Sequence, residues 1–371
     1  MCDYKNELTE IFPQTKKIYN SLIDEQSRKT FAFRMLYNLT EDWNYLFDAA
    51  LLTPEYDKNN INSFRDVYNQ YKSVNEAYPL RNLIIFGAGR WGRTLLEVMS
   101  LTDLRFHSFC DSDINKQNET YCGLPVISPE QLLQDHKQDF VVIGSQDYKK
   151  EINQQLVSMG FPADHILSGE LEKVKYQLEF LFDKQYFEAP IIMPQEDEIF
   201  VDGGCFNCDT SIRFKKWCNE KYKKIYAFEP DPQNYKQCKE IIRQKDIKNM
   251  ELFNAGLWSK NDTLYFDAGK NASSTFINTG TINVPVVSLD QMLNGQRASF
   301  VKLDVEGSEL EALKGAKNTI LLHRPRLAIC VYHKHEDILQ IPLYLQSLVP
   351  DYRFYIRDYS NHSIETVLYA V

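Results

Sequence analysis

The chain has 371 residues, which at roughly 150 residues per domain predicts two or three domains. Its composition, 25% charged and 43% hydrophobic, excludes a disordered chain. The net charge of −9 argues against nucleic-acid binding, because neutralising phosphates needs a basic surface. No apolar run approaches the roughly 20 residues of a membrane-spanning helix, so we expect no membrane span.

The opening MCDYKNELTE lacks the basic and apolar regions of a secretory signal. Eight Cys scattered over a long chain indicate reduced thiols rather than a disulfide framework. We therefore expect a cytoplasmic protein.

Residues 1–79 contain no Gly, and apolar residues such as Ile18, Leu22, Phe31 and Met35 recur at helical spacing. This pattern predicts a helical arm. The arm would pack on the rest of the chain or on a second copy, which makes a homodimer through the arm a candidate assembly.

Residues 80–170 predict a small Rossmann-like domain. The apolar run Leu83–Phe86 precedes Gly87, Gly89 and Gly92 in a GxGxxG pattern, and a helical segment follows. This order is typical of a nucleotide-binding turn, and Asp111, at the end of the next strand, is placed to meet a ribose hydroxyl. The four residues form a candidate nucleotide or nucleotide-sugar site; the alternative is a structural remnant.

The stretch DSDINKQNETYCGLPVISPEQL resembles the accessory nucleotide-binding-like domains of bacterial polysaccharide-biosynthesis proteins. Residues 171–195 then predict a polar linking helix that ends at Pro190 and Pro194, because Pro disfavours helix continuation.

Residues 196–371 predict an α/β domain with seven strands, mostly joined by helical crossovers. The last two strands follow each other directly, so we expect them to pair antiparallel. A doubly wound sheet of this kind binds its ligand at the carboxyl ends of its strands. The expected strands are 199–202, 225–228, 251–254, 301–304, 327–332, 352–357 and 366–369, and the expected helices are 210–221, 232–243, 308–322 and 338–348.

Two carboxylates end the first two strands of this domain. Asp202 precedes Gly203 and Gly204, whose small size allows close approach to the backbone, and Asp202 can meet a cationic amino group. Glu229, at the tip of the second strand, can accept both hydroxyls of a ribose. The pair suits a cationic cofactor with a ribose and no phosphate, which describes S-adenosylmethionine.

The strings DGGCFNCDTS, FEPDP, VPVVSLDQML, FVKLDVEGSELEALKGA and LAICVYHKHE resemble the FkbM-type family of S-adenosylmethionine-dependent methyltransferases. The resemblance covers about 170 residues and implies a class I methyltransferase-like sheet. Members typically methylate hydroxyl groups on sugars or polyketide-type natural products.

The resemblance also implies roles for individual residues. The residues expected to bind the cofactor are Asp202, Gly203, Gly204, Asn207, Ser211, Glu229, Pro230, Asn254, Ala255, Ser274 and Asp304. Lys302, Asp304, Glu306, Gly307 and Glu309 match the motif at the reacting end of the cofactor.

Cys205 and Cys208 depart from the family pattern, which has a small residue and a Gly there. They form a Cys-x-x-Cys pair before a helix, where a thiolate is favoured. Because no second close Cys or His pair supports a zinc site, we interpret them as loop residues and expect no metal.

Asp304, Glu306 and His333 are the candidate catalytic residues. A hydroxyl nucleophile benefits from a base, and all three residues end neighbouring strands, with Lys302 as a charge partner. His333 is the first candidate base because His titrates near neutral pH.

The leading interpretation is an O-methyltransferase that acts on a hydroxyl of a glycan, a nucleotide sugar or a related natural product. The alternative is a non-catalytic binding or scaffolding protein with a degenerate methyltransferase domain. An oxidoreductase or epimerase that uses GxGxxG is weaker, because no Tyr-x-x-x-Lys pair follows at a suitable distance.

Overall fold

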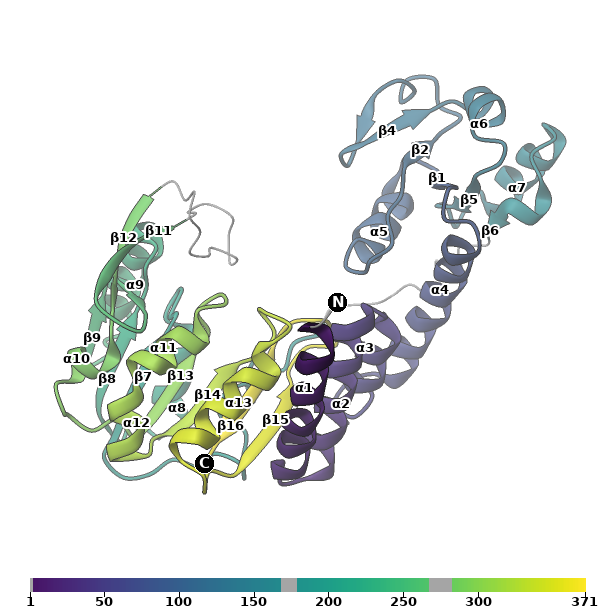
Figure 1. The fold of residues 1–371 in the computed structure, drawn as a ribbon. Helices are drawn as coiled ribbons and strands as arrows, with labels where there is room; N and C mark the ends of the chain where they lie inside the picture. Colours follow the sequence, from purple (N-terminus) through teal and green to yellow (C-terminus); the bar gives the residue numbers. More distant parts are fainter. Residues whose placement is uncertain (1–2, 168–178, 267–281) are drawn as a thin grey trace. The chain divides into compact units, whose positions relative to one another are not determined.

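The computed structural model describes residues 3–167, 179–266 and 282–371. They form two compact units (Figure 1). Unit 1 comprises the described residues of Met1–Leu39 and Phe180–Val371, and unit 2 those of Thr40–Glu179.

A seven-stranded sheet forms the centre of unit 1 (Figure 1). Its order is β15-β16-β14-β13-β7-β8-β9, and β16 alone runs antiparallel to its two neighbours. The predicted doubly wound sheet with a hairpin at one edge is therefore confirmed. The strands are β7 (Glu198–Gly203), β8 (Tyr222–Phe228), β9 (Met250–Phe253), β13 (Phe300–Leu303), β14 (Arg326–Cys330), β15 (Phe354–Asp358) and β16 (Thr366–Ala370).

Both faces of this sheet are covered, because its strands are apolar on both sides. Val201 packs into one core cluster and its neighbour Phe200 into the other. The helices over the first face are α10 (Leu289–Leu293), α11 (Glu309–Gly315), α12 (Lys317–His323) and α13 (Asp337–Leu348); those over the second are α8 (Asp209–Trp217) and α9 (Pro232–Gln244). A small second sheet in the order β10-β12-β11 was not predicted and consists of β10 (Gly256–Leu257), β12 (Ile282–Val287) and β11 (Asp262–Phe266).

The predicted helical arm is divided between the two units. Helix α1 (Asp3–Ser21) places Ile18, helix α2 (Glu25–Thr40) places Phe31, and the segment between them places Leu22 in the core of unit 1. Helices α3 (Trp43–Ala50) and α4 (Lys58–Ala77) lie in unit 2. These three residues are thus buried within their own chain, and a homodimer through the arm stays a prediction.

The predicted linking helix is wrong over its described part. Residues 179–195 form turns and one isolated bridge, Phe180 with Ser360. Tyr186 has a φ of +71°, which an α-helix does not allow, and Tyr186 and Phe187 are buried in a core cluster of the sheet. Burial of these two aromatic side chains holds the segment against unit 1.

Unit 2 contains the predicted Rossmann-like sheet, in the order β3-β4-β2-β1-β5-β6. All of its pairs are parallel except β3 with β4. The remaining elements of unit 2 are β1 (Leu83–Phe86), α5 (Arg90–Met99), β2 (Ser108–Cys110), β3 (Thr120–Tyr121), β4 (Leu124–Ile127), α6 (Pro129–Asp135), β5 (Phe140–Ile143), α7 (Lys149–Ser158), η1 (Ala163–His165) and β6 (Ile166–Leu167). Among the described residues of both units, no helix has the length and apolar character needed to cross a bilayer.

Candidate active site

The predicted cofactor loop begins where β7 ends, and its glycines are required by the neighbouring strand. Gly204 has a φ of +74°, and a Cβ atom there would lie 1.8 Å from the Asp304 carbonyl oxygen. A Cβ on Gly203 would lie 2.7 Å from the Leu303 side chain. The glycines therefore allow the ends of β7 and β13 to approach each other.

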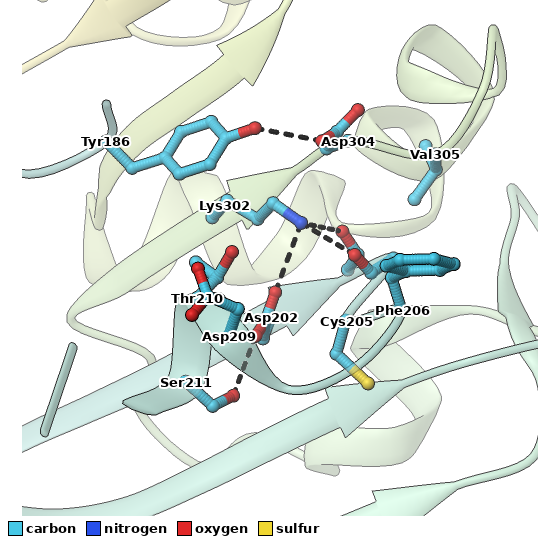
Figure 2. A network of polar contacts seen from close by, with 12 residues as sticks. Tyr186, Asp202, Cys205, Phe206, Asp209, Thr210, Ser211, Lys302, Asp304 and Val305 are labelled. Carbon is cyan, nitrogen blue, oxygen red and sulfur yellow. Dashed lines mark hydrogen bonds and ion pairs between the residues drawn. The ribbon is translucent and has the colours of Figure 1, made fainter. Parts of the chain in front are cut away.

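A buried ion-pair network joins the ends of the same two strands (Figure 2). Lys302 Nζ lies 3.2 Å from Asp202 Oδ1 and donates hydrogen bonds to the carbonyl oxygens of Gly203 (3.0 Å) and Gly204 (2.7 Å). Burial lowers the pKa of Lys302, but the charges of Asp202 and Asp304 outweigh burial and raise it. Lys302 is therefore a fixed cation beneath the loop.

Asp202, Ser211 and Asn207 hold the loop and the start of α8. The Ser211 hydroxyl donates to Asp202 Oδ2 at 2.7 Å, and Asn207 Oδ1 accepts from the Asp209 N–H at 3.0 Å. Asp202 is fully buried, and the cationic group that it meets is Lys302. Asp202 therefore positions Lys302 and the start of α8.

Glu229 lies directly after β8, as predicted, and is 5% exposed. One carboxylate oxygen accepts from the Phe206 N–H and the other from the Asp231 N–H, both at 2.9 Å. Burial raises the pKa of Glu229 to about 7. Because a carboxylate offers about four lone-pair sites, Glu229 can accept hydroxyl groups besides these N–H groups.

Asn254, directly after β9, holds the backbone of Glu229 and Pro230 in place. Its side-chain amide donates to the carbonyl oxygens of Glu229 (2.9 Å) and Pro230 (3.1 Å), and Ala255 beside it is buried. Ser274, the remaining predicted cofactor residue, lies outside the described residues.

The three predicted catalytic residues converge after β13 and β14. His333 Nε2 lies 3.6 Å from Asp304 Oδ1 and 3.4 Å from Glu306 Oε2. His333 Nδ1 lies 2.8 Å from Glu309 Oε1, and the same oxygen accepts from the Val305 N–H at 2.9 Å. Glu309 therefore orients the imidazole so that Nε2 faces the two other carboxylates.

Burial and charge distribute the protons of this cluster unevenly. Burial lowers the pKa of His333, but the bond to Glu309 and the surrounding carboxylates raise it to about 9. Burial raises the pKa of Glu306 to about 7, against the charge of His333. Burial also opposes ionisation of Asp304, but Lys302, His333 and Tyr186 together lower its pKa. Near neutral pH, Asp304 is charged, His333 is protonated and Glu306 is half ionised.

Side chains from distant segments, which no local sequence pattern predicts, also reach the site. The Tyr186 hydroxyl donates to Asp304 Oδ2 at 2.9 Å (Figure 2), and the Tyr332 hydroxyl lies 3.5 Å from Oδ1. Glu365, which follows β15, accepts from Gln185, and burial raises its pKa to about 7. No local pattern marks Tyr186, because only the packing of residues 179–195 brings it to the site.

The GxGxxG segment of unit 2 lines a pocket of about 620 Å³ at the ends of β1 and β5. Gly87 and Gly89 line it together with Trp91 and Tyr148, whereas Gly92 is required by packing, since its Cβ would lie 2.0 Å from the Gly87 carbonyl oxygen. Asp111 also lines it, but one of its oxygens accepts from the Ala88 N–H (2.8 Å) and from Lys116 (3.0 Å). In this arrangement Asp111 anchors the Gly-rich turn.

Comparisons with known proteins agree with these features. Residues 205–359 match the methyltransferase FkbM domain, and residues 80–167 match a family described as C2185-like, N-terminal. The crystal structure of methyltransferase FkbM from Methylobacillus flagellatus is similar, with a TM-score of 0.55 and 20% identity over 80% of this chain and 93% of that chain. An rRNA methylase from Streptococcus thermophilus has a TM-score of 0.34 and 16% identity over 51% of this chain and 92% of that chain.

No curated protein matches the chain. The likeness to the structure from Methylobacillus flagellatus is one of fold, because the sequence identity is 20%. The family match ends within the loop that follows β15 and begins just after Gly204. Residues 205–359 therefore resemble the methyltransferase domain of the FkbM family, and the chain shares its fold with the FkbM methyltransferase from Methylobacillus flagellatus.

Proposed function

We propose that the chain is an S-adenosylmethionine-dependent O-methyltransferase whose acceptor is a hydroxyl of a glycan, a nucleotide sugar or a related natural product. The observation that carries the proposal is the convergence of Asp304, Glu306 and His333 after β13 and β14. They lie at the carboxyl edge of the sheet, where doubly wound folds bind ligands, and Glu229 ends β8 at the same edge.

The side chains present fit this cofactor. Glu229 is a buried carboxylate with unused lone pairs beside the loop, which suits ribose hydroxyls. The carboxylates of Asp304 and Glu306 suit a cation. When bound, the cofactor supplies a methyl group on a cationic sulfur, and the chain's own part is to position the acceptor and remove its proton.

Glu306 is the base in this proposal. With a pKa of about 9, His333 already carries its proton at neutral pH and cannot accept another. Glu306, with a pKa of about 7, is ionised in about half of the molecules and can take the hydroxyl proton. Glu309 positions His333, and Lys302 with Tyr186 keeps Asp304 charged.

A small pocket beside His333 is our candidate for the acceptor. It measures about 180 Å³ and is lined by Tyr332, His333 and His335 from one side and by Tyr37 and Asn38 of α2 from the other. Helix α2 would then contribute to acceptor choice as well as to the fold.

Titration calorimetry of the full chain with S-adenosylmethionine and S-adenosylhomocysteine tests the cofactor. We expect both to bind, and Glu229→Ala to weaken binding by about 10- to 150-fold, since hydrogen bonds to a charged group contribute roughly 1.5–3 kcal/mol. Glu251→Ala, at an exposed glutamate on β9, is the matched control and should not change affinity. Because Glu229 also holds Phe206 and Asp231, melting temperatures of both variants must accompany the titration.

If the chain is instead a scaffolding protein, we expect it to bind neither S-adenosylmethionine nor S-adenosylhomocysteine. Cys205 and Cys208 stand in the loop where the family has smaller residues, and a blocked loop would bind neither form of the cofactor. Absence of binding by a chain that melts cooperatively would favour the scaffold. Unchanged affinity in Glu229→Ala would show that Glu229 is not the ribose ligand.

For unit 2 we propose a nucleotide or nucleotide-sugar site in the pocket lined by Gly87 and Gly89. The pocket's volume of about 620 Å³ lies within the range of small-molecule sites, about 300–1,000 Å³. Arg90, Lys116 and Trp91 line it as well, and they supply charges for phosphates and an aromatic face for a base. Asp111 is assigned to holding the turn rather than to the ribose.

A further inference from the structure

Three buried thiols meet behind the loop that follows β7. Cys205 and Cys208 belong to this loop, and Cys238 lies on α9, thirty residues further along the chain. Their sulfur atoms all lie within 4.8 Å of one another, and Cys205 Sγ is 3.9 Å from Cys238 Sγ. All three residues are at most 2% exposed, and none forms a disulfide.

These distances match a thiolate metal site. A tetrahedral zinc ion with Zn–S bonds of about 2.3 Å separates its sulfur ligands by about 3.8 Å. The spacing of Cys205 and Cys208 is also that of the paired ligands in structural zinc sites. The sequence lacked a third ligand at short spacing, and the fold supplies one in Cys238.

The surroundings can accommodate the charge of such a site. Three thiolates and one Zn²⁺ carry a net charge of −1, and Cys208 is the N-cap of α8, whose nine residues direct a positive helix end toward it. In the metal-free form, the Cys238 thiol donates a hydrogen bond to the Phe206 carbonyl oxygen at 2.9 Å. The three sulfurs leave one position of a four-coordinate zinc ion, which a water molecule would fill.

We propose that Cys205, Cys208 and Cys238 bind one Zn²⁺ as thiolates and so join the loop after β7 to α9. Binding releases the three thiol protons to solvent and needs no oxidant or reductant. The inference is independent of the proposed methyl transfer, since it concerns metal content. Its structural consequence is that Phe206, which donates to Glu229, is held between two zinc ligands.

The test is elemental analysis of the full chain, expressed with zinc and purified without chelator. We expect one zinc per chain, and loss of the metal in Cys238→Ser and in Cys205→Ser. Cys218→Ser is the matched control, because Cys218 is a buried free thiol of the same unit outside the cluster, and this variant should retain zinc. Zinc that persists in both cluster variants would overturn the proposal.

Cobalt substitution keeps the test decisive if a cluster variant fails to fold. Co²⁺ added to metal-free wild-type chain should produce thiolate-to-cobalt charge-transfer absorption, which Zn²⁺ then removes, and Cys208→Ala should reduce this absorption while Cys218→Ser leaves it unchanged. A wild-type chain that contains no zinc and develops no such absorption overturns the proposal. So does a disulfide located by peptide mapping between two of these three cysteines, because the bonded thiols could not bind zinc.

Discussion

At the scale of single residues, Gly204 couples the cofactor loop to the catalytic strand. Its φ of +74° disfavours any other residue, and a Cβ would meet the Asp304 carbonyl oxygen at 1.8 Å. Gly295 has a similar φ of +80° but open space around its Cβ position. Comparing alanine at the two positions therefore distinguishes the cost of backbone strain from that of steric overlap.

We predict that Gly204→Ala destabilises unit 1 more than Gly295→Ala does. The left-handed conformation alone costs about 1–2 kcal/mol in either variant, and displacement of the β13 end adds to this in Gly204→Ala. Hydrogen exchange of the β7 and β13 amides reports unit 1 separately and measures the difference. Equal losses of stability in the two variants would mean that the loop after β7 can shift away from Asp304 without a loss of free energy.

The pKa of Glu306 predicts the acid limb of the pH profile. Because burial raises this pKa to about 7, the carboxyl is protonated at lower pH and cannot accept the acceptor's proton. Turnover should therefore rise as pH increases through about 7. Glu306→Gln should lower turnover about 10²- to 10⁴-fold and abolish this limb, with cofactor affinity within a few-fold of wild type.

Glu365→Gln is the control for that experiment, because burial also raises the pKa of Glu365 to about 7 in the same cluster. This variant should keep the acid limb. If the limb persists in Glu306→Gln and disappears in Glu365→Gln, Glu306 is not the base.

At the scale of elements, helix α2 is fastened to the sheet by a buried ion pair. Arg34 donates two hydrogen bonds to Asp358 Oδ1, at 3.2 and 3.1 Å, and one to the Ser363 carbonyl oxygen at 2.7 Å. Both charged side chains are 4% exposed. On the solvent side of the same helix, Lys29 and Glu25 form an exposed pair at 3.6 Å.

We predict that Arg34→Met destabilises unit 1 by about 3–5 kcal/mol, because Asp358 is left as an unpaired buried charge. Lys29→Met should change stability by at most about 1 kcal/mol, since exposed pairs contribute little. Denaturant unfolding, followed by protection of the β15 and β16 amides, measures both. A small effect in Arg34→Met would show that water reaches Asp358 when the helix loosens.

The break between α11 and α12 is a feature that the local sequence pattern does not predict. The expected helix 308–322 is two helices, α11 and α12, separated at Ala316. Gly315 approaches the Trp258 carbonyl oxygen so closely that a Cβ would lie 1.9 Å from it. The break is set by packing against a segment that lies more than fifty residues earlier.

At the scale of the whole molecule, each unit has a candidate ligand site of its own. The pocket of unit 2 is lined by Gly89, and a Cβ there meets no atom within 4 Å. Gly89 also has an extended backbone, which a β-branched residue tolerates. Valine at this position should therefore project into the pocket without unfolding the unit.

We predict that nucleotides or nucleotide sugars raise the melting temperature of the wild-type chain and that Gly89→Val abolishes this rise. Binding of S-adenosylmethionine should be unchanged, because its proposed site is in unit 1. Ala163→Val, at an exposed position outside the pocket, is the control. If no nucleotide shifts the melting of the wild-type chain, the GxGxxG turn of unit 2 is structural.

Local sequence pattern predicted all seven strands of the large sheet of unit 1 and the strands β1 and β2 of unit 2, but not the small sheet β10-β12-β11. Apolar runs such as Leu83–Phe86 and the residues that form β13 become buried strands because their periodicity and flanking residues are local properties. Position within a strand also determined that Asp202, Glu229 and Asp304 would meet at one edge, since the carboxyl ends of parallel strands share an edge. Those predictions needed only neighbours in the sequence and the handedness of crossovers.

Contacts between side chains far apart in the sequence depend on the packing of the folded chain. Tyr186 reaches Asp304, Cys238 joins Cys205, and Arg34 pairs with Asp358 across more than three hundred residues. The protonation of the cluster was decided in the same way, because the pKa of His333 depends on Glu309 and on burial rather than on its neighbours in the sequence. Such contacts follow from how the helices and loops pack on the sheet. The spacing of apolar residues along the sequence does not predict that packing.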